Sequence, residues 1–218
     1  MKVTPAPIRR LSLALCILAS ALGADAGEIL TIPEIGPHQP ILTVEKNVNP
    51  QNVMVVYTKV DAAGHFLSDP VDPNRPSLDF YWLMDRKTYK PVNALIKAEI
   101  RKRFDAHWAA GDRATHFVVD VNDLKEMKSD IKVLKMDISM RGSGDTRSVE
   151  AQMNLGPSND NARIKLTSIY TEGRAFPPSV QSVTLNGEEV VNGSLTGKKM
   201  TRKYAAGDES NQFPPPRS

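Results

Sequence analysis

Residues 149–170 read VEAQMNLGPSNDNARIKLTSIY and contain two alternating segments around a turn. In the first segment every second residue from Val149 to Leu155 is apolar, and the residues between them are polar. Side chains alternate between the two faces of a strand, so each segment predicts a strand with one face toward a core. The second segment places four residues on the expected core face, namely Ile164, Leu166, Ser168 and Tyr170. The connection 156–161 is rich in turn residues, and the stretch therefore predicts a β-hairpin.

Similar patterns on both sides of this hairpin predict further strands. Residues 53–60 are dense in β-branched side chains, and residues 117–121 are also strand-like. Residues 78–85 alternate, with Leu78, Phe80, Trp82 and Met84 expected to face the core. Residues 180–185 predict a last strand that ends at an Asn186-Gly187 turn, with 188–191 as its partner.

One helix and one ambiguous segment complete the prediction. Asn93 is a suitable N-cap for a helix over 94–107, in which Ile96, Ile100 and Phe104 form an apolar stripe. The basic residues beside the stripe favour a solvated face over a polyanion site. Residues 130–140 change phase, which indicates a strand with a bulge near Leu134, or a helix over 123–134. The fold class expected is mainly β, a single antiparallel β-barrel or β-sandwich domain with one helix.

The N-terminus has the features of a secretory signal peptide. Lys2, Arg9 and Arg10 precede an apolar run at 11–22, which is shorter than the roughly 20 residues that span a bilayer. A small-x-small site then predicts cleavage after Ala26, and hence a periplasmic or extracellular protein. An extended arm (27–40), a β-rich domain (41–204) and a disordered tail (205–218) would follow.

Charge and cysteine content exclude several classes of protein. The chain has 28 basic residues, 25 acidic residues and one cysteine, Cys16. Cleavage would remove three basic residues and one acidic residue, leaving 25 and 24 and no cysteine. A nearly neutral chain gives no electrostatic reason to expect a nucleic-acid partner. We also expect no transmembrane segment in the mature chain, and no disulfide framework.

Motifs that carry chemistry are scarce. The four histidines show no i, i+3 or i, i+4 spacing, and no GxSxG motif occurs. The glycine-rich segment 142–145 and the acidic runs 69–74 and 120–123 are typical of turns and loops. The sequence therefore nominates no catalytic residue, no metal ligand and no cofactor.

Two polar or aromatic features are candidates for binding a ligand. The segment 46–52 is rich in amide side chains and precedes the first strong strand, so it is either a polar site at a barrel mouth or an irregular turn that hydrogen-bonds its own backbone. Tyr81 is expected on the strand face opposite Trp82, where its ring can line a cavity. The candidate ligand-binding residues are Lys46, Asn47, Asn49, Asn52 and Tyr81.

The same segments resemble an uncharacterised bacterial family, the domain of unknown function 4833 (DUF4833). The resemblance lies in ILTVEKNVNPQNVMVVYTKV (41–60), LDFYWLMD (78–85) and a late motif with Pro178, Val180, Val183, Leu185 and Gly187. Together these matches bracket about residues 41–200. The resemblance implies an exported β-rich domain and brings no established activity or catalytic residues.

Three functional hypotheses follow. The first is a non-enzymatic binding module for a small molecule or an envelope component, because closed sheets readily hold ligands. The second is a hydrolase acting on envelope material, with Asp79 or Asp85 beside His65 or His116. The third is a structural or protein-interaction adaptor that uses an edge strand or the basic helix.

Overall fold

The computed structural model describes residues 32, 35–48, 52–84, 88–111, 113–122, 134–155, 163–174 and 179–205. Several predicted features lie outside the described residues. They are the signal peptide, half of the extended arm, the alternative helix at 123–134 apart from its last residue, the segment before the bulge expected near Leu134, the connection 156–161 and nearly all of the C-terminal tail. Candidate residues Asn49 and Asp85 also lie outside them.

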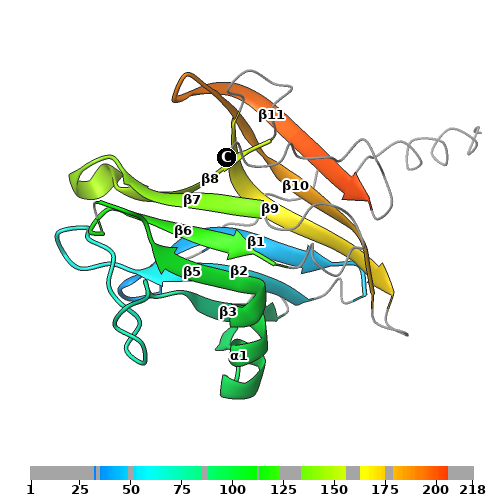
Figure 1. The fold of residues 1–218 in the computed structure, drawn as a ribbon, viewed down its shortest axis with the longest axis horizontal. Helices are drawn as coiled ribbons and strands as arrows, with labels where there is room; N and C mark the ends of the chain where they lie inside the picture. The colour runs from blue at the N-terminus through cyan, green and yellow to red at the C-terminus, as the bar shows by residue number, and fades with distance from the viewer. Residues whose placement is uncertain are drawn as a thin grey trace, which may run out of the picture. The chain divides into compact units, whose positions relative to one another are not determined.

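The described chain is mainly β with one helix, as predicted (Figure 1). The strands belong to one large, mostly antiparallel sheet that is open, so the closed barrel among the predicted alternatives is wrong. The elements in chain order are β1 (His38–Lys46), β2 (Asn52–Lys59), β3 (Asp79–Met84), β4 (Thr88–Pro91), α1 (Ala94–Arg103), β5 (Phe104–Trp108), β6 (His116–Val121), β7 (Leu134–Arg141), a 3-10 turn (Gly144–Thr146), β8 (Ser148–Asn154), β9 (Arg163–Arg174), β10 (Ser179–Val191) and β11 (Ser194–Ala205).

Strand β9 organises the sheet because one of its edges has two partners. Its first part, 163–166, pairs antiparallel with β8, which confirms the predicted hairpin. Its second part, 168–171, pairs in parallel with β1. The other edge of β9 pairs with β10 throughout, and β10 pairs with β11. The strand order is therefore β4-β3-β2-β1-β9-β8-β7-β6-β5, with β10 and β11 as a branch.

A bulge in β9 corrects the predicted facing of its second half. Ser168 pairs with Asn186 of β10 and Leu166 pairs with Gly187, so one residue of β9 is extra at this point. Ile164 and Leu166 are buried as predicted, but Ile169 rather than Ser168 or Tyr170 is buried beyond the bulge. Even-numbered residues of β9 are therefore buried before the bulge and odd-numbered residues after it. The change occurs where the partner of β9 changes from β8 to β1.

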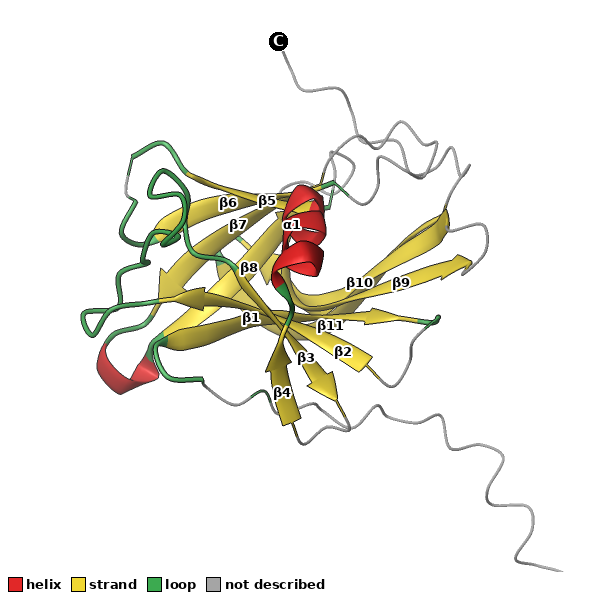
Figure 2. Cartoon of the chain, turned by 90° about the horizontal axis from the view of Figure 1, so that it is seen from below, coloured by secondary structure: helices red, strands yellow, loops and turns green. Residues whose placement is uncertain are grey.

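The core lies between the two halves of the sheet, with β5–β7 in front of β1–β3 in Figure 1. Val56 and Phe80 come from one half and Phe117 and Ile138 from the other, and all four belong to one buried cluster. Leu78 and Phe80 face this core as predicted, and Trp82 packs against it. The helix α1 connects β4 with β5, and in the view from below it lies between these strands (Figure 2). The hydrophobic effect of this burial is the main stabilising term in a chain without disulfides.

The helix is shorter than predicted. Its N-cap is Asn93 as expected, because the Ile96 backbone N–H donates to the Asn93 side chain at 2.9 Å. It ends at Arg103, however, and Phe104 begins β5 opposite Val121 of β6. Ile96 is 42% exposed, so the predicted apolar stripe is wrong at that position. Pairing with β6 outweighs the local helical pattern, because it buries Phe104 in the core.

The predicted turn at Asn186-Gly187 is also wrong. Strand β10 continues through these residues to Val191, and the hairpin turn is Asn192-Gly193, with φ of 51° and 80°. Gly187 has a different role. A Cβ there would collide with the backbone carbonyl oxygen of Lys165 in bulged β9, so only glycine allows the two strands to approach this closely.

Strands β2, β3, β6 and β7 lie where the sequence patterns place them, and Met136 and Ile138 of β7 are buried. Within the described ranges, no helix has the length and apolar character needed to cross a bilayer.

Candidate functional site

The described residues of the amide-rich segment, 46–48 and 52, lie at the end of β1 and the start of β2. Lys46 ends β1, Asn52 begins β2, and both are partly exposed. The Asn47 side chain donates to the Gly173 carbonyl oxygen at 3.1 Å and accepts from the Gly173 N–H at 2.9 Å. Its amide therefore extends the parallel pairing of β1 with β9. The contact is structural, but it joins Asn47 to the backbone of β9 and not to the segment's own backbone, as the predicted irregular turn would require.

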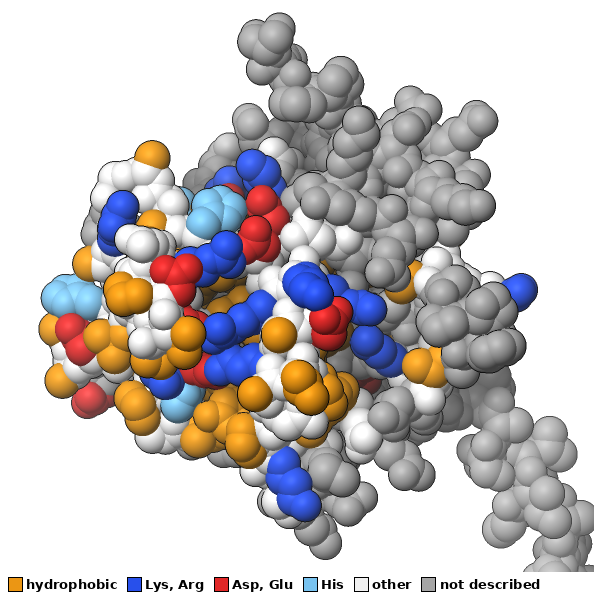
Figure 3. Space-filling model, turned by 60° about the horizontal axis from the view of Figure 1, so that its bottom comes forward, with side chains coloured by type: hydrophobic (Ala, Val, Ile, Leu, Met, Phe, Trp, Pro, Cys, Tyr) orange, Lys and Arg blue, Asp and Glu red, His pale blue; other side chains and the backbone are white. Residues whose placement is uncertain are grey.

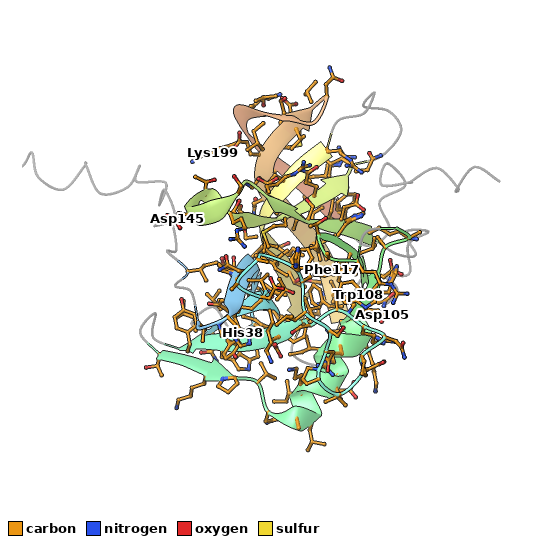
Figure 4. The ribbon with its side chains drawn as sticks, turned by 90° about the vertical axis from the view of Figure 1, so that its left-hand side faces the viewer. His38, Asp105, Trp108, Phe117, Asp145 and Lys199 are labelled. Carbon is orange, nitrogen blue, oxygen red and sulfur yellow. The ribbon has the colours of Figure 1, made fainter. Side chains whose placement is uncertain are left out.

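Tyr81 lies apart from that segment, in a group of aromatic rings on the other face of β3 from the core. Its ring centroid is 5.3 Å from that of Tyr57 and 5.7 Å from that of His38, with nearly perpendicular planes. This edge-to-face arrangement is favourable between aromatic rings. Figure 4 shows His38 on this side of the molecule, away from Phe117 and Trp108 of the core. The structure thus separates Tyr81 from the other candidate residues that it describes.

The aromatic group adjoins a carboxylate, Asp79, whose side chain is only 12% exposed. Lys97 of α1 donates to Asp79 Oδ1. Three groups surround Oδ2: the Ser77 hydroxyl donates to it at 3.1 Å, His38 Nε2 lies 3.3 Å away and Lys59 Nζ 3.7 Å away. We call this group the Asp79 cluster, and its members are His38, Tyr57, Lys59, Ser77, Asp79, Tyr81 and Lys97.

Strand register assembles the cluster from distant parts of the sequence. His38 pairs with Lys59 between β1 and β2, and Tyr57 pairs with Asp79 between β2 and β3. Lys97 reaches the same carboxylate from the second turn of α1. Sequence reasoning considered Asp79 and Tyr81 but missed His38, Lys59 and Lys97. The register of the β1–β2–β3 meander was the signal that would have found the first two.

Electrostatics keep Asp79 ionised. Burial alone would raise the pKa of its carboxyl group, but the hydrogen bond and charge of Lys97, the charge of Lys59 and the hydrogen bond of Ser77 hold that pKa below its ordinary value.

The net pKa shift of the neighbouring phenols has the opposite direction, because burial is its largest cause. Burial raises the pKa of Tyr57, and the nearby phenol of Tyr89 raises it further. Burial, together with the Asp79 charge, also raises the pKa of Tyr81. The cluster therefore holds one carboxylate, two ammonium groups and neutral phenols at neutral pH.

The histidine of the cluster is not placed to act as a general base. His38 Nδ1 lies 2.8 Å from the Ile35 carbonyl oxygen, so this nitrogen donates, and Nε2 faces Asp79. Both ring nitrogens are thus engaged within the protein, whereas a catalytic His–Asp pair leaves one nitrogen for the nucleophile. His65 and His116, which we considered as partners of Asp79, instead pair with Asp61 at 3.1 Å and Asp137 at 3.5 Å.

The basic face of α1 is largely neutralised by carboxylates. Besides Lys97, Arg101 pairs with Asp69, and Lys102 pairs with Glu99 at 2.6 Å. Figure 3 shows lysine and arginine side chains beside aspartate and glutamate on the face that carries the helix. This pairing supports the interpretation that the helix is not a polyanion site. Among the residues that the structure describes, no group of three or more His, Cys, Asp or Glu side chains could hold a metal ion.

No family model, no curated protein and no solved structure matches this chain. The resemblance to the domain of unknown function 4833 stays a prediction.

Proposed function

We propose that the protein is a non-enzymatic binding domain and that the Asp79 cluster holds the anionic group of a small molecule. The observation that carries this proposal is the convergence of two lysines on one poorly solvated carboxylate. Lys59 and Lys97 bring two positive charges against one negative charge, and the surplus attracts an anion.

The cluster also has the accessibility and the donors that an anion requires. The side chains of Lys59 and Lys97 are 29% and 28% exposed, so solvent and small solutes reach them. Each ammonium group has three N–H donors, which exceeds what its contact with Asp79 uses. Charge-assisted hydrogen bonds in a partly desolvated site are stronger than those in water.

The partly exposed ring of Tyr81 adds an apolar wall beside the two charges. A planar acid, with a ring next to its carboxylate, fits these features better than a bare anion does. With the expected signal peptide, the domain would meet such a ligand in the periplasm or outside the cell.

Thermal unfolding with added benzoate, acetate or inorganic phosphate tests the proposal. If Kd is on the order of 1 mM, a benzoate concentration about ten times Kd adds about 1.4 kcal/mol to the free energy of unfolding. This raises Tm by about 3–6 °C. Acetate should have a smaller effect, because it lacks the ring.

The variant Lys59→Gln should lose most of this shift, and Lys135→Gln, which removes an exposed charge on β7, should keep it. Lys97 still pairs with Asp79 in Lys59→Gln, so the variant should fold. Equal shifts in both variants, or no shift with any of the three anions, would disprove the site.

A further inference from the structure

Strand β11 has a long edge that no described strand covers. It pairs with β10 on one side only, whereas the other two end strands, β4 and β5, have just four and five residues. Residues 194–199 and 201–203 of β11 are exposed. Figure 1 shows β11 on the outside of the β9–β10 branch. An uncovered edge presents backbone N–H and C=O groups that can pair with another strand.

All charged side chains of β11 are basic. Residues 194–205 include four basic residues and no acidic residue. Lys198 pairs with Glu189 of the adjacent β10 at 3.3 Å, and Lys203 pairs with Glu172 of β9, one strand further, at 2.8 Å. Lys199 is exposed, and the guanidinium carbon of Arg202 lies 5.7 Å from the Tyr204 ring centroid. Edge lysines of this kind discourage pairing with a second copy, because like charges would then lie side by side.

The segment 198–203 is the regular part of the edge. Before it, the register with β10 shifts between Glu188 and Val190, and Gly197 has φ of 75°. Six residues after this irregularity match the usual length of a strand. The basic side chains are all within these six residues.

From these observations we infer that the β11 edge docks an extended, acidic segment of another protein, which adds to the sheet as a further strand. Backbone hydrogen bonds supply the attachment, and acidic side chains on both faces of the added strand meet Lys199 and Arg202, which lie on opposite faces of β11. The charge that excludes a second copy of this chain favours this partner. This inference does not depend on the Asp79 cluster or its ligand.

Fluorescence anisotropy with three synthetic peptides tests the inference on the wild-type protein. The first peptide is an extended Thr and Val sequence with Glu residues on both faces, the second replaces each Glu with Lys, and the third is the first with N-methyl groups at alternate residues. We expect binding of the first at low ionic strength with a Kd on the order of 10 µM, and no binding of the other two. N-methylation removes backbone donors and keeps the charge, so equal binding of the methylated peptide would overturn strand addition.

A charge-matched pair of double variants locates the site. Lys199→Glu/Arg202→Glu should weaken binding by about tenfold or more, and Arg113→Glu/Lys135→Glu, with the same change of net charge away from β11, should not. Binding of the first peptide should also slow amide hydrogen exchange in residues 198–203. Equal weakening by both double variants, or no binding of the acidic peptide to the wild type, would disprove the inference.

Discussion

Replacing Asp79 by Asn should destabilise the protein, because it removes the negative charge that Lys97 and Lys59 contact. The Asn side chain is nearly isosteric and can still accept from Ser77 Oγ, but it leaves Lys97 and Lys59 without a counter-charge. A hydrogen bond to a charged group contributes about 1.5–3 kcal/mol, and the lysines are partly solvated. We therefore expect a loss of about 2–3 kcal/mol, which lowers Tm by roughly 4–12 °C for a domain of this size.

The loss should depend on pH in a specific direction. The folded protein holds the pKa of Asp79 below the value of an unfolded Asp, which is about 4. Such a carboxyl group contributes its stability above the unfolded pKa and loses it as the pH falls through the folded pKa. The difference between wild type and Asp79→Asn should thus be constant from neutral pH to about pH 5, and shrink as the pH falls below about 4.

Urea unfolding at a series of pH values measures this difference directly. Asp145→Asn, on the exposed 3-10 turn, is the control and should leave stability unchanged at neutral pH. The reasoning fails if Asp79→Asn is as stable as the wild type at pH 7. It also fails if the gap persists undiminished at pH 3, because a shape effect rather than the ionised carboxylate would then explain it.

Three further substitutions test the packing, a side-chain contact and the bulge. Phe117→Ala, at a side chain with no exposed surface, should cost about 3–5 kcal/mol in urea unfolding, whereas Leu95→Ala, at a side chain 84% exposed, should cost almost nothing. Asn47→Ala should cost about 1–2 kcal/mol, because its amide makes two hydrogen bonds to the backbone of β9. Gly187→Ala should lower stability by about 1–3 kcal/mol through its collision with β9, and an unchanged urea midpoint would contradict that steric account.

The sequence predicted strands that alternate in polarity and strands that are dense in β-branched residues. The hairpin of β8 and β9 and the strands β2, β3 and β6 follow from alternation or from β-branched runs. It did not predict β5, because Phe104 lies four residues after Ile100 and continues a helical spacing. Only the pairing of β5 with β6, which involves contacts outside the segment, distinguishes the two structures.

Turn chemistry alone did not place the last hairpin. Two Asn-Gly pairs occur within eight residues, at 186–187 and 192–193, and either one is a strong turn signal. The structure uses the second as the turn, with both residues at positive φ. The first is needed for the close approach of β10 to the bulge in β9, a requirement that arises only after β9 has been placed.

The candidate site depends in the same way on register. His38, Lys59 and Asp79 are about 20 residues apart from one to the next, and their side chains meet because β1, β2 and β3 pair with one particular alignment. A shift of one residue would turn each side chain to the opposite face of the sheet. Residue types and local spacing therefore identified Asp79 and Tyr81 as candidates and could not identify their neighbours.

The topology makes the two proposed binding surfaces separate. Lys59 lies on β2, and β1, β9 and β10 stand between β2 and β11, so four pairings separate the two strands, or about 19 Å measured across the sheet. Effects of substitutions at this distance, without shared partners, are usually additive. A substitution on β11 therefore leaves the contacts of Asp79 in place, and one in the Asp79 cluster leaves the β11 edge in place. Strands β1 and β10 pair with opposite edges of β9. Binding at either surface can therefore be measured without changing the other surface.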